Sequence, residues 1–232
     1  MNRLVVPLLV LAAVSCSRAS GSARSGELRN EVSTAPVAPA RSSGPDTPRI
    51  VALGDSITAG LGLQPGEAYP ALLQKKLKDQ GYPFEVVNAG VSGDTSADGL
   101  RRVDWALEGD VQVLILALGG NDGLRGLPPA QMKENLQGII TKARQRGIAV
   151  LLVGMEGPPN YGERYTTEFR KVFRDLAADN HVPFVPFLLQ GVAGVADLNQ
   201  ADGIHPTARG AERVADLLWP RLEQLIHTGR VK

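Results

Sequence analysis

From residue 48 onward, short apolar runs alternate with amphipathic segments, and this alternation restricts the fold more than any other feature. The most apolar run, Val111–Leu118, contains only one polar residue, as expected for a strand covered on both faces. Four other runs predict strands at Arg49–Leu53, Phe84–Asn88, Ile148–Val153 and Phe184–Val185. Strands that alternate with helices form parallel sheets with helices on both faces. The sequence therefore predicts an α/β protein with a five-stranded parallel sheet in three layers.

The segments between these runs predict helices. Apolar residues recur with helical spacing in five places, at 69–77, 100–107, 136–143, 165–176 and 211–225. Thr95, with Asp98 three residues later, has the pattern of a capping box before the second helix. About 185 residues suit a single domain. We therefore predict one domain over residues 48–232.

Chemistry-bearing segments come directly after several of the predicted strands. These segments are Ser56, Asn88–Ser92, Gly119–Asp122 and Met155–Glu156. In parallel α/β sheets the ligand crevice lies beyond the carboxyl ends of the strands. We therefore expect these segments to gather at one edge of the sheet and to form the functional site there.

The first 16 residues predict export. A positive start is followed by the apolar run from Leu4 to Val14, which is shorter than the roughly 20 residues that span a bilayer. Residues 1–16 are therefore interpreted as a secretory signal peptide. Cys16, the only cysteine, directly follows the run, as in bacterial lipoprotein signals, in which this residue is lipidated. We favour a periplasmic, membrane-anchored lipoprotein; ordinary cleavage near Cys16 is the alternative.

Residues 17–47 predict a flexible linker. They are rich in Ser, Ala, Pro, Gly and Arg and hold few large apolar side chains, so they cannot bury enough surface to offset the entropy of ordering. The formal net charge of the chain is +1, and no run of Lys or Arg is present. Nucleic acid is therefore not an expected partner. We expect contact with the membrane only through the N-terminal anchor.

Asp202 and His205 stand three residues apart near the C-terminus. A serine hydroxyl needs a base to accept its proton, and the base needs a third group that orients its ring. Of the three histidines, His227 is expected near a helix end and His181 in a turn, which leaves His205 as the candidate base. Ser56 is the candidate nucleophile, with a helix N-cap as its alternative role. The chain has no G-x-S-x-G motif, so the α/β-hydrolase elbow is absent.

Two glycine-containing segments offer hydrogen-bond donors for negative charge. Gly90–Thr95 can present backbone N–H groups at a helix start, and Asn121 can present its side-chain amide. A plain turn is the alternative for each segment. No His or carboxylate cluster with ligand spacing accompanies them, and the P-loop Lys-Ser/Thr is missing. We therefore expect neither a metal nor a cofactor.

Taken together, these motifs resemble the four sequence blocks of the GDSL or SGNH hydrolases. The matching residues are Gly54-Asp55-Ser56, Gly93, Asn121 and Asp202-x-x-His205, and the resemblance covers residues 48–226. It is closest to the bacterial periplasmic thioesterase I/arylesterase/lysophospholipase enzymes. It implies a flavodoxin-like fold in which Ser56 is the nucleophile, His205 the base and Asp202 its orienting partner. It also implies an oxyanion hole made by the backbone N–H groups of Ser56 and Gly93 and the Asn121 side chain.

The resemblance further implies an enzyme that hydrolyses small acyl esters or thioesters, including lysophospholipids, through an acyl-enzyme intermediate. We expect the enzyme to be a monomer. Substrate contacts are expected from the loop after Asn121, from the following wall and beside the catalytic histidine. The residues are Gly123, Leu124, Leu127, Met155 and Ile204. Two alternatives stay open: an esterase that removes acetyl groups from glycans or the cell wall, and an anchored binding module without activity.

Overall fold

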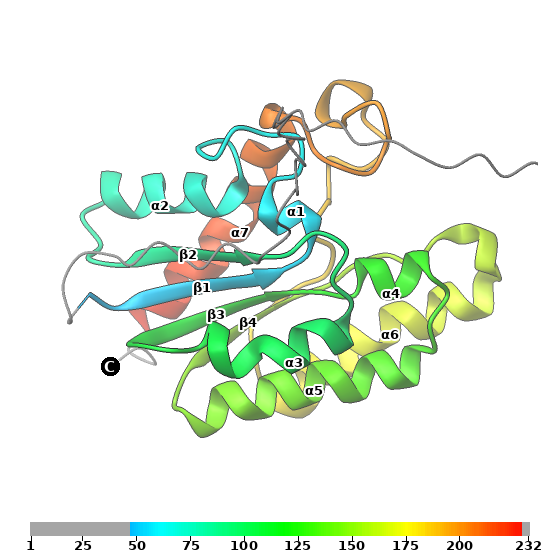
Figure 1. The fold of residues 1–232 in the computed structure, drawn as a ribbon, viewed down its shortest axis with the longest axis horizontal. Helices are drawn as coiled ribbons and strands as arrows, with labels where there is room; N and C mark the ends of the chain where they lie inside the picture. The colour runs from blue at the N-terminus through cyan, green and yellow to red at the C-terminus, as the bar shows by residue number, and fades with distance from the viewer. Residues whose placement is uncertain (1–46, 229–232) are drawn as a thin grey trace, which may run out of the picture. The chain divides into compact units, whose positions relative to one another are not determined.

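A parallel sheet forms the centre of residues 47–228, the part of the chain that the computed structural model describes (Figure 1). Its strands are β1 (Arg49–Gly54), β2 (Glu85–Gly90), β3 (Val111–Ala117), β4 (Ala149–Val153) and β5 (Phe184–Val185). They pair in the order β2-β1-β3-β4-β5, which is the flavodoxin-like order. The prediction of a five-stranded parallel α/β sheet is confirmed.

Helices cover both faces of the sheet and complete the three layers (Figure 1). On one face α2 (Tyr69–Asp79) packs against α7 (Ala208–His227). On the other face α5 (Pro129–Gln145) packs between α3 (Ser96–Ala106) and α6 (Gly162–Asn180). Four short elements lie in the connections: α1 (Ser56–Ala59), α4 (Gly120–Leu124) and the 3₁₀ turns η1 (Pro159–Tyr161) and η2 (Ala196–Leu198).

The hydrophobic core is centred on β3. Every residue of this strand except Gln112 is buried, and Val113 to Ile115 have no exposed surface. Burial of each such side chain contributes roughly 1.5–3 kcal/mol to folding. The edge strand β5 has only two residues and is flanked by Pro183 and Pro186, which cannot donate a backbone hydrogen bond.

The register of the sheet brings the ends of three strands into one row. Gly54 at the end of β1 pairs with Gly90 of β2 on one side and with Ala117 of β3 on the other. A side chain on Gly90 would lie 2.2 Å from the backbone nitrogen of Ala59, so α1 rests directly on the end of β2. The chain therefore leaves all three strands at one edge, and Ser56 lies there.

The loop after β2 is held at the start of α3 by the predicted capping box. The Thr95 hydroxyl accepts the backbone N–H of Asp98 at 3.3 Å, and the Asp98 carboxylate accepts the backbone N–H of Thr95 at 2.9 Å. Both interactions satisfy N–H groups that a helix start leaves unpaired. This prediction is confirmed, and it fixes the position at which the loop around Gly93 returns to helix.

Three predictions lie outside the described residues: the signal peptide over 1–16, the lipid anchor at Cys16, and the linker over 17–47 except for its last residue. Across residues 47–228, no helix has both the length and the apolar character needed to cross a membrane.

Candidate active site

Ser56, His205 and Asp202 form one hydrogen-bonded chain. Ser56 is the first residue of α1, and the other two lie on the loop before α7, almost 150 positions later in sequence. His205 Nε2 lies 2.8 Å from Ser56 Oγ, and His205 Nδ1 lies 2.6 Å from Asp202 Oδ2. Because a carboxylate can only accept, Nδ1 carries the proton and Nε2 is free to accept the serine hydroxyl. The fold thus brings the three predicted residues together.

The loop itself prepares Asp202 to remain a carboxylate. Its Oδ1 accepts the backbone N–H of Ile204 at 2.9 Å and that of His205 at 3.0 Å. These hydrogen bonds lower the pKa of Asp202 to about 2. The His205 backbone N–H has the largest effect, and the His205 ring and the Ile204 N–H come next. Asp202 is therefore ionised at every pH at which a histidine can act as a base.

Gln200 fastens this loop to the segment that follows α1. Its backbone N–H donates to the His205 carbonyl at 2.7 Å. Its side-chain amide donates to the carbonyls of Pro206 at 2.9 Å and Leu61 at 2.7 Å. The segment after the serine and the loop that carries the histidine are thereby linked independently of the Ser56–His205 contact.

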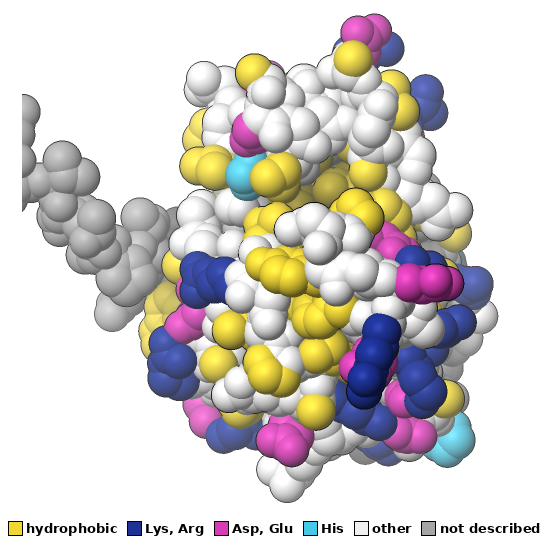
Figure 2. Space-filling view, turned by 90° about the vertical axis from the view of Figure 1, so that its right-hand side faces the viewer, with side chains coloured by type: hydrophobic (Ala, Val, Ile, Leu, Met, Phe, Trp, Pro, Cys, Tyr) yellow, Lys and Arg dark blue, Asp and Glu magenta, His cyan; other side chains and the backbone are white. Residues whose placement is uncertain are grey.

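A small, mostly apolar cavity lies beside Ser56 and His205. Side chains from α1, α2, α7, the segment after α1 and the loop before α7 line it, including Ile57, Leu61, Leu63, Tyr69, Pro206 and Val214. Sequence reasoning missed Leu61 and Leu63. The available signal was a Gly-Leu-Gly-Leu segment shortly after the serine motif. Figure 2 shows the face at the carboxyl edge of the strands, where hydrophobic side chains gather across the middle beside a histidine.

The predicted oxyanion donors lie at the same edge of the sheet. The backbone N–H groups of Ser56 and Gly93 donate to no other group among residues 47–228. Gly93 has φ +87°, a conformation that favours glycine. The Asn121 amide donates to the carbonyl of Asp94 at 3.0 Å, which holds it against the Gly93 loop and uses one of its two N–H groups. The role of these groups in stabilising an oxyanion stays a prediction.

The predicted substrate contacts differ in accessibility. Leu124 and Ile204 are 49% and 41% exposed, so both can meet a ligand directly. Leu127 is half-buried, whereas Gly123 and Met155 are buried. Direct contact of these two residues with substrate stays a prediction.

Two arginines that the sequence did not single out contact the loop after β2. Arg102 Nε lies 2.6 Å from Asp94 Oδ2, and Arg102 Nη2 donates to the carbonyl of Gly54 at 3.0 Å. Arg125 Nη2 donates to the carbonyl of Gly93 at 2.8 Å. A single sequence gives no signal for either contact, because both depend on how segments distant along the chain pack together.

The arrangement places a serine hydroxyl on a histidine, a carboxylate on the other ring nitrogen, and two N–H groups that have no partner among residues 47–228 at the same edge. Acyl transfer requires groups of these kinds. Two nearby carboxylates have partners of their own. Asp94 pairs with Arg102, and Asp122 accepts both the backbone N–H and the hydroxyl of Ser96. Across the described part of the chain, no three His, Cys, Asp or Glu side chains are grouped so as to hold a metal ion.

Comparisons with known proteins point to one family. The model of the GDSL-like lipase/acylhydrolase family matches residues 52–213. The esterase TesA of Pseudomonas aeruginosa is 48% identical over 178 residues, which are 76% of this chain and 89% of the relative. The thioesterase 1/protease 1/lysophospholipase L1 of Escherichia coli K12 is 36% identical over 188 residues, 81% of this chain and 88% of the relative.

Solved structures agree with this result. A crystal structure of TesA has a TM-score of 0.74 and covers 76% of this chain and 99% of its own. The psychrotrophic esterase EstA from Pseudoalteromonas, in a structure inhibited by monoethylphosphonate, is 32% identical with a TM-score of 0.72. That match covers 78% of this chain and 99% of EstA.

Asp55, directly before Ser56, is a buried carboxylate that is only 3% exposed. Its Oδ1 accepts the backbone N–H of Ile57 at 3.0 Å and caps α1, so the interpretation of Ser56 as the N-cap is wrong. Burial is the largest influence on the pKa of Asp55 and raises it to about 6, although the Ile57 N–H and the nearby His205 act in the opposite direction. Ionised Asp55 is therefore a cost to folding at neutral pH.

We predict that Asp55→Asn stabilises the protein more at pH 7 than at pH 4. The pKa of Asp55 in the folded protein lies above its ordinary 3.8, so ionisation opposes folding increasingly as the pH rises from about 4 through about 6. Asn cannot ionise and keeps an oxygen that can cap α1. The difference in unfolding free energy between variant and wild type should grow by up to roughly 3 kcal/mol over this interval.

Urea unfolding of both proteins at pH 4 and pH 7 measures this difference. Asp197→Asn is the matched control, because Asp197 is 80% exposed and its carboxylate stays in water on folding. The prediction would be contradicted if the difference in unfolding free energy between Asp55→Asn and the wild type were the same at pH 4 and pH 7.

Proposed function

Because the chain belongs to the GDSL-like lipase/acylhydrolase family, we propose that it is a serine esterase and thioesterase that cleaves acyl esters through an acyl-enzyme intermediate. One observation carries the proposal: the hydrogen-bonded chain from Ser56 Oγ through His205 to Asp202, with distances of 2.8 and 2.6 Å. It is the arrangement that a weak serine nucleophile needs in order to react at neutral pH. The family resemblance inferred from the sequence motifs is confirmed.

In the first half of the reaction, Ser56 Oγ attacks the carbonyl carbon while His205 Nε2 accepts the serine proton. The carbonyl oxygen becomes an oxyanion, which the N–H groups of Ser56 and Gly93 and the free N–H of Asn121 can stabilise. Asp202 stabilises the imidazolium through Nδ1. Collapse of the intermediate breaks the bond to the leaving oxygen or sulfur, which takes the proton from Nε2 and departs as an alcohol or thiol.

In the second half, water takes the place of the leaving group. His205 Nε2 accepts a proton from water, and the resulting hydroxyl oxygen attacks the acyl carbon attached to Ser56. Collapse returns the proton to Ser56 Oγ and releases a carboxylic acid. All catalytic groups come from one chain, so we propose that the enzyme acts as a monomer, and no step calls for a cofactor.

The substrate class is supported by the names of the relatives and by the surface of the site. TesA is named an esterase, and the Escherichia coli relative is named a thioesterase and lysophospholipase. Leu61, Leu124 and Ile204 are each exposed by more than 40% at this edge of the sheet. Such side chains can cover an apolar acyl chain, which fits esters and thioesters of fatty acids.

We also propose that the enzyme is exported to the periplasm and held at the membrane by a lipid on Cys16. The support is the sequence of residues 1–16, which has a positive start, a short apolar run and a cysteine directly after it. One or two acyl chains at that position would tether the domain through residues 17–47.

Ser56→Ala should lower kcat for p-nitrophenyl butyrate by at least about 10⁴-fold, because the nucleophile is removed. A fluorophosphonate probe, which reacts with an activated serine, should label the wild type and fail to label the variant. Circular dichroism shows whether the variant is folded. Wild-type turnover by a folded Ser56→Ala variant would refute the proposal, and absence of both turnover and labelling in the wild type would favour the binding module.

Asn121→Ala should lower kcat by about 10²- to 10³-fold with little change in KM, because it removes a donor to the oxyanion. Asn121→Asp keeps the size of the side chain but replaces the amide donor with an acceptor, so it should lose at least as much activity. Steady-state kinetics on the same ester measure both variants. Unchanged kcat in Asn121→Ala would remove this residue from the oxyanion hole.

Cys16→Ala should abolish incorporation of radiolabelled palmitate and move the protein from the membrane fraction to the soluble periplasmic fraction. Ser17→Ala is the control, since it alters the neighbouring position and leaves the thiol in place. Equal labelling of wild type and Cys16→Ala would show that the cysteine carries no lipid.

A further inference from the structure

Arg125 places a guanidinium group beside the proposed oxyanion hole. Its guanidinium lies on the Gly93 peptide, with Nη2 2.8 Å from the Gly93 carbonyl oxygen. Arg125 is exposed, and it takes part in none of the ion pairs between residues 47 and 228. A guanidinium has five N–H donors, and only one of them has an acceptor in the described chain.

The acidic side chains of the surrounding segments are occupied elsewhere. Asp94, next to Gly93 in sequence, pairs with Arg102 at 2.6 Å. Asp122, on the short helix α4 that ends just before Arg125, accepts the Ser96 hydroxyl at 2.6 Å. Glu156, in the segment that follows β4, pairs with Arg170 at 2.8 Å. No carboxylate of residues 47–228 therefore forms an ion pair with Arg125, and its side chain is exposed.

The backbone on both sides of Arg125 is held in place. The Tyr161 hydroxyl donates to the carbonyl of Leu124 at 3.1 Å, and a side chain on Gly126 would come within 2.8 Å of the Tyr161 ring. Two residues further on, the Tyr165 hydroxyl donates to the carbonyl of Leu127 at 2.9 Å. These contacts restrict the segment before substrate binds, which lowers the entropic cost of using Arg125 as a binding group.

We propose that Arg125 binds a phosphate group on the leaving part of the acyl substrate. This inference rests on the proposed function, because it assigns the leaving group of that same reaction. Guanidinium groups match phosphate oxygens with paired hydrogen bonds, and charge-assisted bonds of this kind are stronger than neutral ones. The exposed Leu124 beside Arg125 adds apolar surface, so the segment suits an amphiphile with an acyl chain and a phosphate.

Two leaving groups carry this chemistry: the phosphorylated thiol of coenzyme A and the phosphodiester of a lysophospholipid. Matched pairs of substrates isolate the phosphate. Octanoyl-coenzyme A is compared with S-octanoyl-N-acetylcysteamine, which has the same thioester and no phosphate. A lysophosphatidylcholine is compared with the monoacylglycerol that has the same acyl chain.

Arg125→Gln should lower kcat/KM for the phosphate-bearing substrate by about 10- to 100-fold, while the phosphate-free partner changes less than about threefold. In the wild type, added salt should reduce the preference for the phosphate-bearing substrate, because Arg125 is exposed and salt screens its attraction for phosphate. Arg125→Lys keeps the charge and should retain part of the preference. Arg174→Gln is the matched control, since Arg174 is an exposed arginine on α6.

If Arg125→Gln loses the preference for the phosphate-bearing substrate in both pairs, Arg125 forms a general phosphate site. If it loses the preference in one pair only, that pair identifies coenzyme A or the lysophospholipid as the source of the phosphate. An equal decrease of kcat/KM on phosphate-bearing and phosphate-free substrates would overturn the proposal, because Arg125 would then act through Gly93. An unchanged kcat/KM on both kinds of substrate would also overturn it.

Calorimetric titration with free coenzyme A separates this inference from the proposed function. Binding about tenfold weaker in Arg125→Gln than in the wild type supports the phosphate site, even if no ester is hydrolysed. Equal binding, together with an unchanged preference for lysophosphatidylcholine over its monoacylglycerol, rejects the phosphate site even if the enzyme is active.

Discussion

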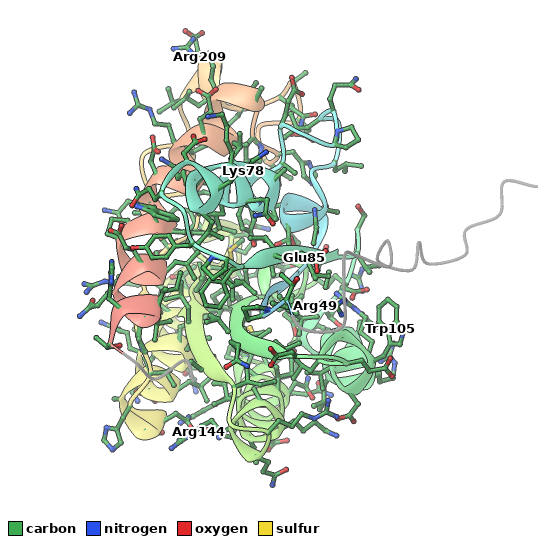
Figure 3. All side chains as sticks on the ribbon, turned by 90° about the vertical axis from the view of Figure 1, so that its left-hand side faces the viewer. Arg49, Lys78, Glu85, Trp105, Arg144 and Arg209 are labelled. Atoms are coloured by element: carbon green, nitrogen blue, oxygen red, sulfur yellow. The ribbon has the colours of Figure 1, made fainter. Side chains whose placement is uncertain are left out.

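The parallel pairing of β1 with β2 on one side and β3 on the other is the constraint on which the site depends. This pairing aligns Gly54, Gly90 and Ala117 in one row. The three segments that leave this row carry Ser56, Gly93 and Asn121, so one register fixes the relative positions of the proposed nucleophile and the proposed oxyanion donors. The strand order changes direction around β1 and β3, which is where ligand crevices occur in such sheets. At the opposite edge, viewed in Figure 3, the ion pair between Arg49 and Glu85 joins β1 to β2 at its start.

Two carboxylates close to the serine, Asp202 and Asp55, have different pKa values because their local environments differ. Asp202 lies on an exposed loop and accepts two backbone N–H groups, which lowers its pKa to about 2. Asp55 is buried and accepts one, and the loss of hydration raises its pKa to about 6. The difference follows from solvent access and donor number, since the two side chains are chemically identical. Asp202 is suited to stabilise a positive imidazole, whereas Asp55 is suited to cap a short buried helix.

Local patterns predicted much of this molecule before any tertiary contact was known. The runs that became β1, β3, β4 and β5 were found because strand burial leaves a continuous apolar signal, and the capping box at Thr95 was found because it involves neighbours in sequence. Strand β2 ends two residues later than predicted, at Gly90, because pairing with β1 continues to Gly54. The short helices α1 and α4 were missed, since four or five residues carry too little periodicity to detect.

Most helices and strands, their parallel arrangement and the candidate chemical groups are readable from the sequence, because periodicity, caps and reactive side chains are properties of neighbouring residues. The sequence identified Ser56 and Asp202-x-x-His205 by their chemistry and motifs. The 2.8 Å approach of His205 to Ser56 and the contact of Arg125 with Gly93 come from the tertiary structure alone. These depend on packing between segments far apart in the chain, where sheet register and burial set the distances.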